Sequence, residues 1–170
     1  GDSEYALRFL SVMMGVLVIP LTYVTGRRLF SSEAGLATAA ITTISPFLVW
    51  YSQEARMYTM LALLSLASVY ALLRALEPGS KRPMRRWLAW VLITAAALYT
   101  HFTAFFLLPF EALAMMIGLW RVNRRWAVMA MAGVIVLAVP VIVYGVSRVP
   151  SGVEPSFSFK AEVSMRVPTC

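Results

Sequence analysis

One short string, residues 51–58 (YSQEARMY), holds more reactive side chains than any neighbouring part of the chain. It contains two ionisable groups, Glu54 and Arg56, and two phenols, Tyr51 and Tyr58. On a helix Glu54 and Tyr58 share a face at i,i+4, whereas Glu54 and Arg56 point apart. A carboxylate at a helix N-terminus is favoured by the helix dipole, but the same dipole disfavours Arg56. The pattern therefore favours a binding role, with Arg56 seeking an anion from outside the string.

Two further polar residues stand out against an apolar background. His101 follows Tyr99 and Thr100 at a predicted turn on the same side of the chain as Glu54 and Arg56, and its alternative role is an interfacial hydrogen bonder. Glu111 lies about 13 Å along the next helix, in an apolar run that contains no cation. A carboxylate at that depth must face the bundle interior, a water-filled cavity or a partner. For Glu111 the alternative is a hydrogen bond that holds two helices together.

Composition indicates what must position these residues. Hydrophobic residues make up 60% of the 170 positions, charged residues 14%, and the mean hydropathy is +0.75. A soluble domain of this size needs far more surface charge, so the class is an all-α polytopic membrane protein. The net charge of +7 is explained by basic loops, and a nucleic-acid partner is not predicted. The single cysteine, Cys170, forms no Cys/His cluster, so neither a metal site nor a cofactor is predicted.

Six apolar runs predict about six transmembrane helices. They span residues 9–25, 36–50, 57–76, 87–100, 102–120 and 126–147. The stretch 87–120 is too long for one crossing, so it requires a tight turn near His101. Residues 2–10 mix charged and apolar side chains, which predicts a short outer juxtamembrane helix that leads into the first span. The transmembrane domain is expected to cover residues 1–149, and residues 150–170 are expected to form a weakly structured tail outside the membrane.

The basic residues predict the orientation of the bundle. Ten of the fifteen lie at the end of the first, third and fifth runs or in the loops that follow them, namely Arg27, Arg28, Arg74, Lys81, Arg82, Arg85, Arg86, Arg121, Arg124 and Arg125. Short basic loops stay in the cytoplasm, so both ends of the chain are predicted to be extracytoplasmic. The string 51–58 and His101 then lie together on the outer side.

These motifs resemble bacterial family-39-like glycosyltransferases of the GT-C class over about residues 1–148. The similarity rests on YSQEARMY at 51–58, on Tyr99-Thr-His101 before Glu111, and on GDSEYALR at 1–8 and GRRLF at 26–30. It implies a GT-C-like enzyme of the bacterial inner membrane that moves a sugar from a polyprenyl-phosphate donor to an acceptor on the outer face.

The resemblance also implies roles for the residues and identifies partners. Arg56 would contact the donor phosphate with help from His101, Glu54 and Tyr58 would shape the cavity or position the acceptor, and Glu111 joins the substrate-binding set. Membrane lipid and the lipid-linked sugar donor are the expected partners, with room for other membrane subunits. A divalent metal would belong to the full-length enzyme, and nothing in these residues supports one.

The chain departs from the family in one respect. The family's principal catalytic acid lies in a first outer loop that precedes the segment matching Gly1, so no catalytic residue is predicted and the segment is expected to be inactive alone. The alternative function is a non-enzymatic scaffold subunit of a larger membrane complex. A transporter is less favoured, because Pro109 and Pro140 are single kink candidates and no run is interrupted by paired Gly and Pro.

Overall fold

The computed structural model describes residues 2–53, 57–79, 82–118 and 124–147. Within these ranges the regular structure is entirely helical, which confirms the predicted all-α class. The elements are α1 (Asp2–Leu29), α2 (Ser32–Ile44), α3 (Pro46–Gln53), α4 (Tyr58–Ala75), α5 (Pro83–Thr100), the 3-10 helix η1 (Phe102–Phe106), α6 (Leu107–Gly118) and α7 (Arg124–Ser147).

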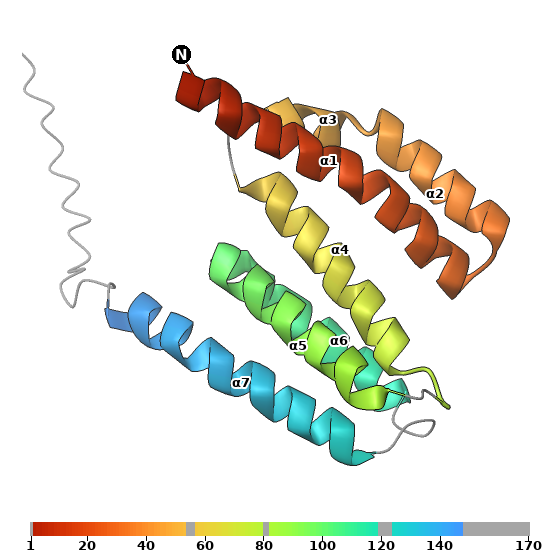
Figure 1. The fold of residues 1–170 in the computed structure, drawn as a ribbon, viewed down its shortest axis with the longest axis vertical. Helices are drawn as coiled ribbons and strands as arrows, with labels where there is room; N and C mark the ends of the chain where they lie inside the picture. Colours follow the sequence, from red (N-terminus) through yellow and green to blue (C-terminus); the bar gives the residue numbers. More distant parts are fainter. Residues whose placement is uncertain (1, 54–56, 80–81, 119–123, 148–170) are drawn as a thin grey trace, which may run out of the picture.

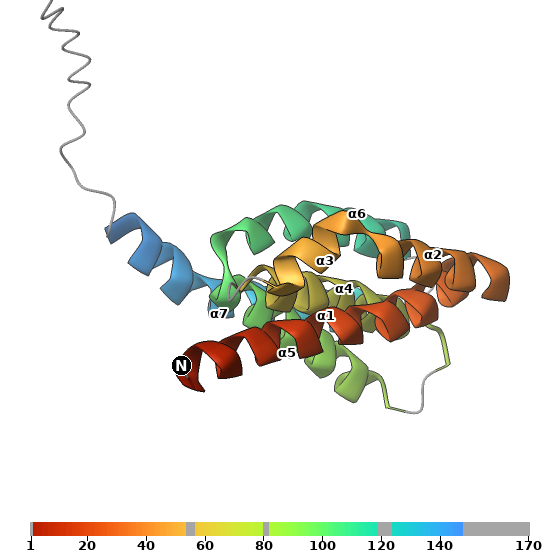
Figure 2. The same ribbon diagram turned by 90° about the horizontal axis from the view of Figure 1, so that it is seen from above.

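The longer helices pack side by side in one row. Helix α4 lies between α1 and α5, α2 pairs with α1, and α7 packs against α5 on the side away from α4 (Figure 1). The two short helices α3 and α6 lie on the same face of this row (Figure 2). Helix α3 contacts α1 and α4, and α6 contacts α4. Helix α4 is therefore the central element, between the group of α1, α2 and α3 and the group of α5, α6 and α7.

The bundle has two chemically different ends. One end, here called the rim, is where α4 begins and α5 ends; the other, the basic end, is where α1 and α4 end and α5 and α7 begin (Figure 1). Eight of the ten predicted loop basics fall in or beside these basic-end segments. They are Arg27, Arg28, Arg74, Arg82, Arg85, Arg86, Arg124 and Arg125, whereas Lys81 and Arg121 lie outside the described residues.

The structure supports a membrane fold, but it does not show six spans. Among the described residues three helices are long and apolar enough to cross a membrane, at Arg8–Leu29, Tyr58–Ala75 and Arg124–Tyr144. The fourth run forms α5, whose first turn includes Arg85 and Arg86. In the fifth run the turn at His101 is followed first by the 3-10 helix η1 and then by the twelve-residue α6.

The second run, predicted as one span, is interrupted at Pro46. Helix α2 ends at Ile44, Ser45 is extended at φ −65° and ψ 114°, and α3 begins with Pro46. The ring of a proline disfavours the helical conformation in the residue before it, so α2 must end there. Pro46 itself is well placed at the first position of α3, where no backbone N–H is needed.

The predicted separate juxtamembrane helix is wrong. Residues 2–10 form the first turns of α1, which continues without a break to Leu29. No proline precedes Pro20 in this helix, so nothing stops the chain between the charged start and the apolar run. The first predicted span is therefore the middle of a longer helix.

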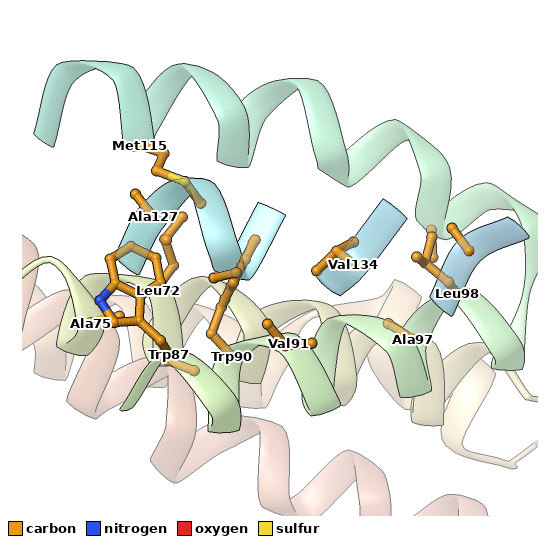
Figure 3. Close-up of a cluster of buried hydrophobic side chains, with 14 residues drawn as sticks. Leu72, Ala75, Trp87, Trp90, Val91, Ala97, Leu98, Met115, Ala127 and Val134 are labelled. Atoms are coloured by element: carbon orange, nitrogen blue, oxygen red, sulfur yellow. The ribbon is translucent and has the colours of Figure 1, made fainter. Parts of the chain in front are cut away.

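The buried core lies where α4, α5, α6 and α7 meet (Figure 3). Its largest buried side chains include Trp87 and Trp90 of α5, with ring centroids 6.1 Å apart and nearly perpendicular planes. Leu72 of α4 and Val134 of α7 belong to the same buried cluster. Many large apolar side chains remain exposed around the bundle, for example Ile44 at 77%. A soluble protein rarely leaves so much apolar surface uncovered, whereas lipid covers it in a membrane.

Candidate functional site

The structure brings together two of the five predicted site residues. The rings of Tyr58 and His101 lie 5.8 Å apart, centroid to centroid, at the rim. Tyr58 opens α4, and His101 is the residue between α5 and η1. Glu54 and Arg56 lie outside the described residues. The roles assigned to Glu54 and Arg56 therefore stay predictions.

Tyr58 and His101 are the end of a longer aromatic row. The ring of Tyr51 lies 5.0 Å from that of Tyr58 in an edge-on arrangement, and Phe47 lies 4.5 Å from Tyr51. The row of Phe47, Tyr51, Tyr58 and His101 thus joins α3, α4 and the turn after α5. Such offset and edge-on contacts are the favoured geometries of aromatic pairs. Phe47 was not predicted as a site residue, because an apolar aromatic residue within an apolar run carries no signal of its own.

The ring of His101 is fixed by its own turn. The backbone of His101 is extended, at φ −159° and ψ 140°, and its Nδ1 accepts a hydrogen bond from the Thr103 backbone N–H at 3.1 Å. The Thr103 hydroxyl lies 2.8 Å from the same nitrogen. Because Nδ1 is an acceptor, the proton of the neutral ring is on Nε2. The predicted turn is confirmed, and His101 presents one N–H donor.

Glu111 is buried in a polar cluster that joins three helices. Its side chain is 2% exposed, and the Ser68 hydroxyl donates a hydrogen bond to Oε1 at 2.5 Å. Ser68 Oγ also lies 2.6 Å from Thr94 Oγ1. Ser68 belongs to α4, Thr94 to α5 and Glu111 to α6. Glu111 therefore faces the bundle interior and hydrogen-bonds a neighbouring helix, as its isolation in an apolar run predicts.

Two polar atoms in this region are buried without a hydrogen-bond partner among the described residues. They are Glu111 Oε2 and the indole nitrogen Nε1 of Trp90, and the Trp90 side chain interacts with the Glu111 carboxyl. Trp90 is fully buried. One atom is an acceptor and the other a donor, so they are complementary. Trp90, Ser68 and Thr94 were not singled out from the sequence, since hydroxyls and indoles are common in membrane helices.

Glu111 does not sit with the rim residues. Ser68 is ten residues beyond Tyr58 on α4, about 15 Å along the axis, and Thr94 is seven residues before His101, about 10 Å. The predicted set of five residues is thus divided. Tyr58 and His101 lie at the rim, and Glu111 lies in a buried layer below them.

Comparison with known proteins places the chain in a family. The sequence model described as dolichyl-phosphate-mannose-protein mannosyltransferase matches residues 1–144, which include the rim and the buried cluster. The chain belongs to this family. No curated protein and no solved structure matches it. Membership confirms the GT-C-like glycosyltransferase resemblance found in the sequence.

As a member of the mannosyltransferase family, the chain would be expected to recognise a lipid-linked sugar. The described rim residues offer a phenol and an imidazole N–H, both of which hydrogen-bond phosphate or sugar oxygens. Among the described residues no group of three His, Cys, Asp or Glu side chains is arranged to hold a metal ion. The arrangement at the rim suits binding and orientation of a polar headgroup.

Proposed function

We propose that this protein transfers a sugar from a polyprenyl-phosphate donor to an acceptor at the outer face of the membrane. The observation that carries the proposal is the pairing of Tyr58 with His101 at the rim, within a chain of the mannosyltransferase family. This pairing puts the helix that follows Arg56 beside the turn that holds an imidazole N–H donor. A phosphate-bearing substrate requires a cation and a hydrogen-bond donor, and we assign these roles to Arg56 and His101.

Four of the predicted site residues have a proposed role in that reaction. When the bond from the sugar to the phosphate oxygen breaks, negative charge grows on the phosphate, and a fixed cation stabilises that charge. Arg56 supplies the cation, and the Nε2–H of His101 adds a neutral hydrogen bond to the same group. Glu54 and Tyr58 position the acceptor hydroxyl. No general base is assigned to the described residues.

The membrane arrangement proposed here retains six passes. Helices α1, α4 and α7 supply three of them by length and hydropathy. The remaining passes are α5, the pair α2 and α3, and the pair η1 and α6. The basic end faces the cytoplasm of a bacterial inner membrane under the positive-inside rule, so the rim and the tail 150–170 face outward.

The experiment that tests the proposal removes the cation. In membranes that contain the full-length protein and polyprenyl-phosphate-mannose with a labelled sugar, Arg56→Ala is expected to slow transfer about 30- to 1000-fold, because one charge-assisted contact is lost from the transition state. Arg56→Lys should restore only part of the rate, since an ammonium cannot form the paired contacts of a guanidinium.

Arg85→Ala is the matched control. It removes an exposed arginine from the basic end of the bundle, so membrane insertion and transfer should remain near normal. If Arg56→Ala transfers as well as Arg85→Ala, the string 51–58 has a structural role. The chain is then better described as a scaffold subunit.

A further inference from the structure

Helix α6 is attached to the bundle along one narrow stripe. Of its twelve residues only Glu111 and Met115 are buried, and they lie one helical turn apart. Gly118 continues the stripe, because a Cβ added there would meet the Leu76 side chain at 2.8 Å. The large side chains of Phe110, Leu113, Met116 and Ile117 are exposed. The attachment of α6 therefore depends on few contacts.

The hydrogen bonds of Glu111 carry much of that attachment in a membrane. Lipid tails are as apolar as a helix surface, so apolar contact alone gives little drive for α6 to leave the lipid. The bond between Glu111 and Ser68 ties α6 to α4, and the contact between Ser68 and Thr94 ties α4 to α5.

The same helices lead to the rim, because α4 begins there, α5 ends there, and α6 follows the turn at His101 through η1. Both arms of the turn at His101 are fixed, one by Thr94 on α5 and the other by Glu111 on α6. Ser68 holds both arms to α4, the helix that starts at Tyr58. Opening of the cluster would let the His101 turn move away from Tyr58.

Packing alone does not account for the choice of residues. Glu111 Oε2 and Trp90 Nε1 are buried without a well-formed hydrogen bond, although the two side chains interact, and a buried polar group that is poorly paired costs stability. Apolar contact has no preferred direction, so packing alone is compatible with more than one rotation or register of α6. A directional hydrogen bond, in contrast, fixes one register of α6 against α4.

We propose that the cluster of Ser68, Thr94 and Glu111 sets the position of His101 against Tyr58, so that Glu111 is a positioning residue for recognition of the donor phosphate. This role rests on the proposed function, in which His101 contacts that phosphate. Glu111 acts through the turn and does not touch the substrate.

The test is a double-mutant cycle on donor binding. The full-length protein in lipid nanodiscs is titrated with polyprenyl-phosphate-mannose, and Kd is measured for His101→Ala, Glu111→Leu and the double variant. Each single change is expected to raise Kd about tenfold, the size of one charge-assisted hydrogen bond. If Glu111 acts through His101, the double variant binds no more weakly than His101→Ala. Glu111→Gln keeps an acceptor for Ser68, so its Kd should stay within about threefold of the parent.

Met115→Ala is the matched control, because it weakens the packing of α6 and keeps the hydrogen bond of Glu111. It removes buried volume one turn beyond Glu111, and its effect on Kd should be small and should add to that of His101→Ala. Additive effects of Glu111→Leu and His101→Ala would overturn the positioning role while leaving the proposed function intact. A normal Kd for both single variants would contradict the proposed function and the positioning role together.

Discussion

The backbone of α2 at Gly35 lies directly against the backbone of α1 at Tyr23. A Cβ added to Gly35 would lie 2.7 Å from the carbonyl oxygen of Tyr23 and 2.9 Å from the backbone nitrogen of Arg27. Contacts this short with backbone atoms cannot be relieved by turning a side chain. Gly26 on α1 faces the same place, since its added Cβ would be 3.1 Å from the Cα of Gly35. Small residues allow this kind of close approach in membrane proteins.

Gly35→Ala should therefore separate α1 from α2. The expected loss is about 1–3 kcal/mol of unfolding free energy, the usual cost of overpacking a close contact. Thermal unfolding in detergent, followed by tryptophan fluorescence or light scattering, measures the change. The matched control is Gly133→Ala, whose added Cβ would lie 3.6 Å from Val91 in ordinary contact. Equal melting temperatures for the two variants would show that α1 and α2 are not in close contact.

Glu77 links three segments at the basic end. It forms ion pairs with Arg28 of α1 and with Arg86 of α5, whose Nη1 lies 3.0 Å from Glu77 Oε2. The same Nη1 donates to the carbonyl oxygen of Arg74 near the end of α4. All three charged groups are about one-third exposed, so the pairs are screened by solvent.

Glu77→Gln should destabilise the protein modestly, by about 1 kcal/mol for two partly exposed pairs. Because salt screens such pairs, the difference from the parent should shrink as ionic strength rises from 0.01 to about 1 M. Melting temperatures at the two salt concentrations provide the measurement. A difference that is unchanged by salt would mean that Glu77 acts through shape or hydrogen bonding.

The orientation of the bundle can be tested at two exposed positions on opposite ends. Pro78 lies in the loop between α4 and α5, and Phe102 starts η1 at the rim. With the native cysteine removed by Cys170→Ser, Pro78→Cys should resist a membrane-impermeant thiol reagent in intact cells, whereas Phe102→Cys should react, because the basic end is predicted to be cytoplasmic. Both positions should react after the cells are permeabilised. Labelling of Pro78→Cys in intact cells would reverse the orientation.

Much of the helical fold could be predicted because its signals are local. Apolar runs and basic loops gave the class, and the excessive length of 87–120 gave the turn at His101. The break at Pro46 was equally local and was missed, because the apolar run continued through it. The continuous helix α1 was missed because charged residues near its start were interpreted as a separate surface segment.

The sequence predicts the inward position of Glu111 but not the residues that surround it. An unpaired carboxylate in an apolar run indicates that Glu111 faces inward, and the structure confirms this. The identity of its partners depends on how α4, α5 and α6 are rotated about their axes. Ser68 and Thr94 gave no signal, since either residue can bond to its own helix as Thr42 does to the Thr38 carbonyl. The depth of Glu111 below the rim, in contrast, follows from its position about 13 Å along the helix.

The last prediction separates the two nitrogens of His101. Nδ1 accepts from the Thr103 backbone N–H and caps η1, whereas Nε2 carries the proposed donor toward the phosphate. In His101→Asn the amide oxygen takes the place of Nδ1 and caps the turn well, but the chain is too short to replace Nε2. In His101→Gln the amide nitrogen reaches the place of Nε2 and the cap is lost.

We expect His101→Asn to keep its melting temperature and to bind polyprenyl-phosphate-mannose about tenfold more weakly, the size of one lost hydrogen bond to a charged group. His101→Gln should bind within about threefold of the parent and melt at a lower temperature, since a cap is worth about 1 kcal/mol. Donor titration and thermal unfolding of the same two samples give both readings. If the order is reversed, so that Gln loses binding and Asn retains it, the atom that matters to the donor is Nδ1, and the role proposed for Nε2 is wrong.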